Sequence, residues 1–187
     1  MMAKCHPNRR KPRAARQALL VVGEGPTEKA FLTHLKALYD TRDSGFSIKV
    51  ENAHGGSPEC IIDRARKLGQ MRAYDAILIV MDTDRPWPVA RQRAKGFGRS
   101  KVFFVGTRPC IEGLLLSILG HTAFDPAQRS PEDCRRALRD HGLSDDTKTD
   151  TRTHARVFTR DILEGKRETL QALGDIVSFL TAGSIGP

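Results

Sequence analysis

Apolar residues in the first 120 positions form short continuous runs that alternate with segments of helical periodicity. The run Ala18–Gly25, ALLVVGEG, has no polar interruption before its glycines, which is typical of a strand buried on both faces. In the segment TEKAFLTHLKALYD that follows, Ala30, Phe31, Leu35 and Leu38 recur at helical spacing. We therefore predict a strand, a tight turn and a helix.

This strand and helix unit repeats along the chain. FSIKVEN (46–52) alternates apolar and polar residues like a strand, and PECIIDRARKLGQM then places its apolar residues on one helical face. Four further segments continue the alternation: the buried run at the start of AILIVMDTDRPWP (76–88), a short polar helix WPVARQRAKG, the strand KVFFVG (101–106) and the apolar helix IEGLLLSILG. Such alternation predicts an α/β fold, a mainly parallel sheet of about four strands with helices on both faces.

Apolar density falls after Gly120. Residues 130–142 predict one amphipathic helix, 143–156 a polar loop, and 157–180 one or two terminal helices. We expect three parts: an arm at 1–17, an α/β core at 18–120, and a helical extension of the same domain at 121–187.

The charge balance indicates a polyanionic partner. Lysine and arginine number 31 against 22 acids among 187 residues, giving a net charge of +9 and a pI near 9.8. The first sixteen residues hold six of the basic residues and no acid, which predicts a flexible basic arm for nucleic acid; a solubilising tail is the alternative.

Targeting and cysteine patterns favour a cytoplasmic protein. The basic start lacks the apolar core of a secretory signal, and no apolar run approaches the roughly 20 residues of a membrane span. The four cysteines form no C-x-x-C pair, so neither a zinc ribbon nor a disulfide framework is predicted.

Five acids follow the predicted strands, and ligands of parallel sheets bind where strands end. Glu24 and Glu28 follow the first strand, Asp82 and Asp84 the third, and Glu112 the fourth. Each alone has an ordinary explanation, because Glu28 suits a helix start and Asp82 a helix cap. Converging carboxylates would repel one another without a cation, and oxygen ligands favour Mg²⁺ or Mn²⁺.

The turn GEGPTE after the first strand excludes two nucleotide-binding motifs. Gly23 and Gly25 allow a sharp turn that presents Glu24, and Pro26 suits the first helical position. The third small residue of a dinucleotide fingerprint is replaced by Glu28, and no G-K-[ST] follows as in a P-loop.

Basic residues predicted near the same strand ends are candidates for binding phosphate. Arg85, Lys101 and Arg108 are the first group, and Lys148 in the polar loop is a fourth; solvated loop charges are the alternative. Trp87 and Phe97 are the candidates for stacking on single-stranded bases.

Three ordered blocks resemble the Toprim domain, and more closely the RloB-like family of Toprim proteins, which is related to OLD-type nucleases. VVGEGPTEKAFL resembles the family's C-E-G-x-T-E block, AILIVMDTD its aspartate pair, and TRPCIEGLLL its N-P-C-F-E-L-W-L-L block. HGGSPECII stands where the family has a glycine–serine turn. The match spans about residues 18–119, and the aromatic and histidine of the last family block are missing here.

The resemblance implies Mg²⁺-dependent phosphodiester chemistry in bacterial defence against phage or foreign DNA. Glu24 would be the central acid, Asp82 and Asp84 catalytic metal ligands, and Glu28 and Glu112 supporting ligands. It also implies a separately encoded ABC-type ATPase partner, because this sequence has no Walker motif. The implied activity is that of a Toprim-type nuclease.

Two other functions remain open from the sequence. A module that binds nucleic acid or an ATPase without cleavage would also use the basic arm. A phosphohydrolase with Asp82 as nucleophile and Asp84 as acid/base would explain the D-x-D at a strand end, although it would leave Glu24 and Glu28 unused.

Overall fold

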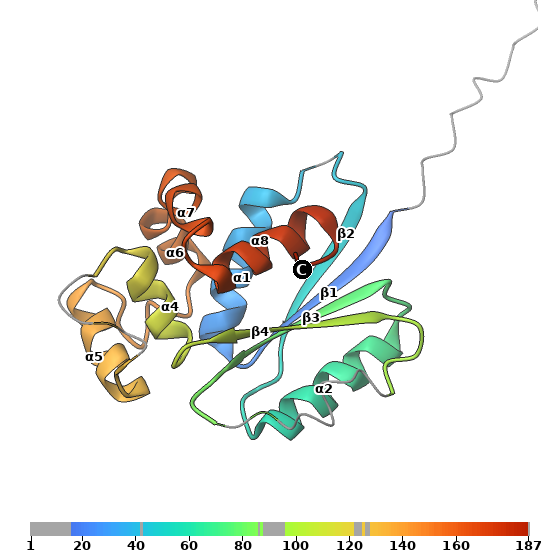
Figure 1. Ribbon diagram of the computed structural model, residues 1–187, viewed down its shortest axis with the longest axis horizontal. Coiled ribbons are helices and arrows are strands. Elements are labelled where there is room, and N and C mark those ends of the chain that lie inside the picture. The colour runs from blue at the N-terminus through green and yellow to red at the C-terminus, as the bar shows by residue number, and fades with distance from the viewer. Residues whose placement is uncertain are drawn as a thin grey trace, which may run out of the picture.

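The computed structural model describes residues 16–41, 43–85, 87, 96–121, 125 and 128–186 (Figure 1). Nearly all of the predicted basic arm, and all but the ends of the helix predicted from WPVARQRAKG, lie outside these ranges.

Four strands form one parallel sheet, which confirms the predicted α/β class. The strands are β1 (Gln17–Gly23), β2 (Phe46–Asn52), β3 (Ala76–Asp82) and β4 (Lys101–Thr107). Their order is β2-β1-β3-β4, and every pairing is parallel. This order is consistent with a Toprim-like architecture. The carboxyl ends of all four strands therefore share one edge of the sheet.

Helices follow the strands and then make up the C-terminal part of the chain. Their bounds are α1 (Pro26–Tyr39), α2 (Pro58–Met71), α4 (Ile111–Ile118), α5 (Pro131–Asp140), α6 (Thr151–Val157), α7 (Arg160–Arg167) and α8 (Gln171–Ala182). Figure 1 shows α2 on one side of the sheet and α1, α4 and α8 on the other.

Both faces of the two central strands, β1 and β3, are buried, as their continuous apolar runs predict. Leu19, Val21 and Leu78 face the larger core, which contains side chains of α1, α4 and α8. The alternate residues of β1 and β3, such as Leu20 and Ile77, face the smaller core beneath α2. Successive side chains of a strand point to opposite faces, so a strand between two helical layers has no polar position in its centre.

The C-terminal region differs from the sequence prediction in one segment. The prediction of a polar loop at 143–156 is wrong in its second half, because α6 begins at Thr151. Asp150 caps that helix by accepting a hydrogen bond from the Arg152 amide, and His154 is buried against the ring of Phe31. The short polar sequence forms a helix because tertiary contacts stabilise it. One or two terminal helices are predicted at 157–180, and the structure has two, α7 and α8.

No helix in the described ranges combines the length and the apolar character that crossing a membrane requires.

Gly23 lets the end of β1 approach the first turn of α1. A Cβ atom at this position would lie 2.5 Å from Cβ of Glu28 and 3.2 Å from Cδ1 of Leu32. No side chain fits there without a shift of the backbone. The glycine thus fixes the distance between the strand and the helix that carries Glu28.

We expect Gly23→Ala to destabilise the protein by roughly 1–3 kcal/mol, because the added methyl overpacks the contact with Glu28. Gly165→Ala is the matched control, since nothing lies within 4 Å of a Cβ at that position of α7. The control substitution should be neutral or stabilising by about 0.5–1 kcal/mol. Chemical denaturation measures both, and equal effects of the two substitutions would contradict the close approach.

Candidate active site

Four of the five predicted acids line one cavity at the carboxyl edge of the sheet. Glu24 follows β1, Glu28 lies in the first turn of α1, Asp82 ends β3, and Glu112 lies in the first turn of α4. The cavity holds about 460 Å³. The parallel sheet brings the four together, because its strands end at one edge and the helices that follow begin there.

Asp82 is the most firmly held of these carboxylates. Its Oδ1 accepts hydrogen bonds from the Thr107 hydroxyl at 2.7 Å and from the Ile111 amide at 2.9 Å. Thr107 ends the neighbouring strand β4, and Ile111 is the first residue of α4. Because the two donors belong to different elements, β4 and α4, they fix the orientation of the Asp82 side chain.

Glu24 and Glu28 are held by backbone amides. Oε2 of Glu24 accepts a hydrogen bond from the Asp82 amide at 3.2 Å, which joins the ends of β1 and β3. Oε2 of Glu28 accepts from the Gly25 amide at 2.9 Å and so caps the start of α1. Each glutamate has one oxygen engaged in this way, and both side chains line the cavity.

Burial and crowding favour the protonated forms of these acids. Burial raises the pKa of Glu28 to about 7, and the charges of Glu112 and Glu24 add to the rise. Burial raises the pKa of Asp82 to about 8, and the charge of Glu28 makes the next largest contribution to this rise. The pKa of Glu24 is also raised by burial, although the hydrogen bond from the Asp82 amide opposes the shift. Glu28 and Asp82 therefore bind protons more tightly than free carboxyl groups do.

Lys148 comes from the loop before α6 and brings a positive charge to the cluster. Its Nζ lies 3.1 Å from Oε1 of Glu112 and 2.8 Å from Oδ1 of Asp145. Burial opposes protonation, but the hydrogen bonds to these two acids raise the pKa of Lys148 overall. The Lys148 carbonyl lies 2.6 Å from Nε2 of buried His154, which anchors this loop.

Arg135 is a site residue that the sequence analysis missed. It lies on α5, lines the cavity, and its Nε is 3.6 Å from Oε1 of Glu112. Thr107 and Ile111 were missed as well, although they orient Asp82. Thr107 directly follows the predicted strand 101–106, and this position at a strand end is a signal that could have found it. Nothing in the local sequence of Arg135 indicates the packing of α5 near α4.

Asp84 and Arg85 do not line the cavity. Both side chains are exposed, and the chain bends away from the sheet after Asp82. Their charges still affect the cluster, because Asp84 raises and Arg85 lowers the pKa of Glu24. The D-x-D pair therefore supplies one lining carboxylate instead of two, since extended geometry ends at its first member.

Lys101 and Arg108 lie elsewhere than predicted. Lys101 is the first residue of β4, so it lies at the amino edge of the sheet, and its expected place near the acids is wrong. Seven strand residues separate the two edges by about 20 Å. Arg108 follows the carboxyl end of β4 but lines a different hollow, between β4, α4 and α8.

Both aromatic candidates pack against the smaller core. Phe97 is buried in the smaller core, where it is 5 % exposed. Trp87 packs against the same core, and its Nε1 donates a hydrogen bond to the Asp82 carbonyl at 2.9 Å. Trp87 thus supports the loop after β3.

The donor chemistry of the cavity fits a hard divalent cation, whereas the ligand geometry is not formed. Four carboxylates share one cavity, and burial raises the pKa of three of them, Glu24, Glu28 and Asp82. Among the described residues, however, no three His, Cys, Asp or Glu side chains are arranged to hold a metal ion together. The ammonium of Lys148 lies against Glu112 instead.

Comparisons of this chain with protein-family models, curated proteins and solved structures find no match. The Toprim resemblance therefore remains a prediction from the residues quoted above.

The raised pKa values predict that the metal-free protein is more stable in mild acid. The pKa of Glu28 rises from 4.5 unfolded to about 7, and that of Asp82 from 3.8 to about 8. A folded state with raised pKa values binds protons more tightly than the unfolded chain. This contribution is complete below about pH 4 and is lost as the pH rises through 7 to 8. Urea denaturation in EDTA at pH 5 and pH 8 measures the loss.

Glu28→Gln isolates this effect, because the amide oxygen can still accept the Gly25 hydrogen bond. We expect the variant to gain roughly 2 kcal/mol relative to wild type between pH 5 and pH 8. Glu168→Gln, an exposed position at the end of α7, is the control and should leave the pH dependence unchanged. If the free energy of unfolding of Glu28→Gln depended on pH as it does in the wild type, the pKa of Glu28 would not be raised by folding.

Proposed function

We propose that this protein is a metal-dependent phosphodiesterase that cleaves nucleic acid. The observation that carries the proposal is the meeting of four carboxylates from three separate segments around one cavity. Buried acids are costly for the fold unless they serve a cation or a proton transfer. Basic side chains beside the acids complete a site suited to phosphate.

The residues that would hold the cation are Glu24, Glu28, Asp82 and Glu112. Bound there, Mg²⁺ or Mn²⁺ would polarise a phosphoryl oxygen and lower the pKa of a water molecule. Asp82 is already oriented by Thr107 and the Ile111 amide, so it needs no rearrangement to present its second oxygen.

Glu24 is suited either to bind the cation or to move a proton. Its hydrogen bond to the Asp82 amide fixes one oxygen at the end of β3. Its raised pKa brings the carboxyl closer to the working pH, where a general acid or base is most effective. In both roles, the second carboxylate oxygen of Glu24 would face the substrate.

Lys148 and Arg135 are the phosphate ligands in this proposal. Both lie against Glu112, whose negative charge they neutralise while the cavity holds no substrate. A cation taken up by Glu112 would release the Lys148 ammonium, and a phosphate group would then replace the carboxylate as its partner. Arg135 offers a planar fork of donors from the same side.

Nucleic acid is the substrate class that the overall charge favours. The net charge of +9 steers the protein to polyanions, and exposed Arg85 lies beside the cluster. A role in phage defence and an ABC-type ATPase partner rest on the family resemblance alone.

A binding module without cleavage is the second candidate. The ion pair of Lys148 with Glu112, and the lack of a formed ligand set among the described residues, favour it. The phosphohydrolase with Asp84 as acid/base has less support, because the Asp84 side chain lies outside the cavity.

The proposal predicts cleavage of labelled single- or double-stranded DNA or RNA with Mg²⁺ or Mn²⁺. Glu24→Gln and Asp82→Asn should each reduce the rate at least about 100-fold, since each removes a carboxylate from the reacting centre. Glu168→Gln should cleave as fast as wild type. Gel electrophoresis of the labelled strands, with and without EDTA, measures the rates.

Two results would contradict the nuclease. Cleavage that survives Asp82→Asn would assign the activity to another site or to a contaminant. Salt-sensitive binding of nucleic acid without any metal-dependent cleavage would favour the binding module, because the basic groups alone suffice for it.

Lys148→Met separates the two roles of this lysine. Without the ammonium, Mn²⁺ should bind several-fold more tightly in calorimetry, because Glu112 loses its competing partner. The same variant should bind nucleic acid more weakly and show a smaller salt dependence, by about one charge. Lys67→Met, an exposed position on α2, is the control. Unchanged Mn²⁺ affinity in Lys148→Met would contradict the competition.

A further inference from the structure

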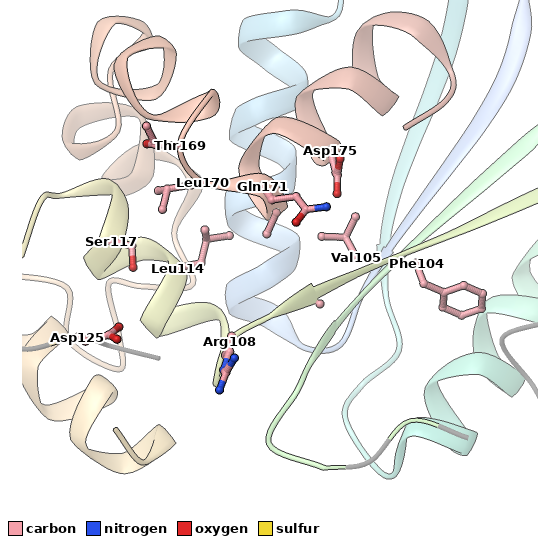
Figure 2. Close-up of a pocket in the computed structure, with 12 residues that line it drawn as sticks. Phe104, Val105, Arg108, Leu114, Ser117, Asp125, Thr169, Leu170, Gln171 and Asp175 are labelled. Atoms are coloured by element: carbon pink, nitrogen blue, oxygen red, sulfur yellow. The ribbon is translucent and has the colours of Figure 1, made fainter. Parts of the chain in front are cut away.

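A second hollow lies beside β4 and shares no lining residue with the acid cavity. It holds about 510 Å³, the size of a ligand site, and is bounded by β4, α4 and the start of α8 (Figure 2). Phe104, Val105 and Gly106 of β4 all line it. The side chains of Phe104 and Val105 belong to opposite cores, so the hollow follows the edge of the strand.

No described strand pairs with the edge of β4 beside this hollow. Among the residues that the structure describes, β4 is the last strand of the sheet and pairs only with β3. The Lys101 amide donates to Asp75, and the Thr107 carbonyl accepts from Thr83, so odd-numbered residues of β4 bond towards β3. The backbone groups of Val102, Phe104 and Gly106 therefore face away from the sheet.

This edge lacks the features that usually prevent strand pairing. Within β4, KVFFVGT, there is neither a proline nor a charge after Lys101, and the register with β3 has no bulge. Val102, Phe103 and Phe104 keep part of their surface exposed. An apolar, regular and unpaired edge is a template for another strand.

Two opposite charges flank the hollow without partners. Neither Arg108 nor Asp175 makes a hydrogen bond or ion pair with any residue the structure describes. Figure 2 shows the Asp175 carboxylate pointing from α8 towards β4 near Val105, and the Arg108 side chain pointing away from the helices. Burial raises the pKa of Asp175, and no cation compensates for it.

We propose that this hollow binds an extended peptide segment of a partner protein, which adds to β4 as a fifth parallel strand and places a basic side chain against Asp175 and an acidic one against Arg108. Strand addition supplies main-chain hydrogen bonds from Val102, Phe104 and Gly106. The charges of Asp175 and Arg108 then determine which peptide sequences bind.

The positions of the charges define the spacing in the peptide. Val105, beside Asp175, and Arg108 are three residues apart, about 10 Å in an extended chain. Residues three apart in a strand point to opposite faces, which agrees with the directions of Asp175 and Arg108 in Figure 2. The peptide should therefore read basic-x-x-acidic in the direction of β4.

The test uses the full-length protein and the labelled, end-blocked peptide Thr-Val-Lys-Val-Thr-Glu-Thr, with binding measured by fluorescence anisotropy. We expect saturable binding, and at least tenfold weaker binding of the peptide with Lys and Glu exchanged. Two further peptides carry N-methyl groups on alternate residues of one edge or the other. Only one of them should lose binding, because one edge of a strand faces β4.

Variants of the protein test the charges. Asp175→Asn should weaken the Lys peptide at least fivefold, while Asp161→Asn, an exposed position on α7, should not. The Asp175→Lys variant should bind a peptide in which Glu replaces Lys more tightly than it binds the original peptide. Circular dichroism confirms that each variant is folded. Asp175 lies outside the acid cavity, so Asp175→Asn should cleave nucleic acid like wild type if cleavage is observed.

Four outcomes would overturn the proposal. They are the absence of saturable binding up to 1 mM peptide, equal binding of both N-methylated peptides, stronger binding of the charge-exchanged peptide, and full competition by free arginine, which would indicate a small-molecule site. Sedimentation velocity adds a fifth, because a dimer that dissociates on Phe104→Asp would assign the edge to a second copy of this chain.

Discussion

The alignment of all strands in one direction is the constraint on which the site depends. In a parallel sheet every carboxyl end lies at the same edge, and each following helix begins there. Glu24 and Asp82 end neighbouring strands, while Glu28 and Glu112 occupy the first turns of helices. Acids from three segments that are far apart in the sequence become neighbours because of this single property of the fold.

The fold tolerates these acids through local interactions. Amides of Gly25, Ile111 and Asp82 donate to three of the carboxylates, and the helix starts favour negative charge near Glu28 and Glu112. Lys148 and Arg135 compensate for Glu112 from the C-terminal region. Burial, and then the charges of neighbouring acids, raise the pKa values of Glu28 and Asp82. The protonation of these two acids links the stability of the fold to the pH.

The C-terminal region serves both hollows. The loop before α6 and helix α5 bring Lys148 and Arg135 to the acids, and the start of α8 brings Asp175 to the edge of β4. The segment from Arg108 to Glu112 contributes to both hollows, since Arg108 lines the second hollow whereas Ile111 and Glu112 line the acid cavity. A partner bound at β4 would therefore lie within a few residues of the elements that orient Asp82.

The sequence by itself determined the four strands and their alternation with helices, because buried runs and helical periodicity are local signals. This alternation predicts a parallel sheet, and so it also determined the edge at which Glu24, Glu28, Asp82 and Glu112 meet. It did not determine that the Asp84 side chain is exposed or that Lys101 lies at the amino edge of the sheet. It also did not determine α6, whose buried His154 packs against Phe31. Only the tertiary structure decided that Arg135 and Lys148 neutralise Glu112 and that Arg108 faces another hollow. Ion pairs and hollows between segments far apart in the chain depend on packing geometry, which no local pattern of residues encodes.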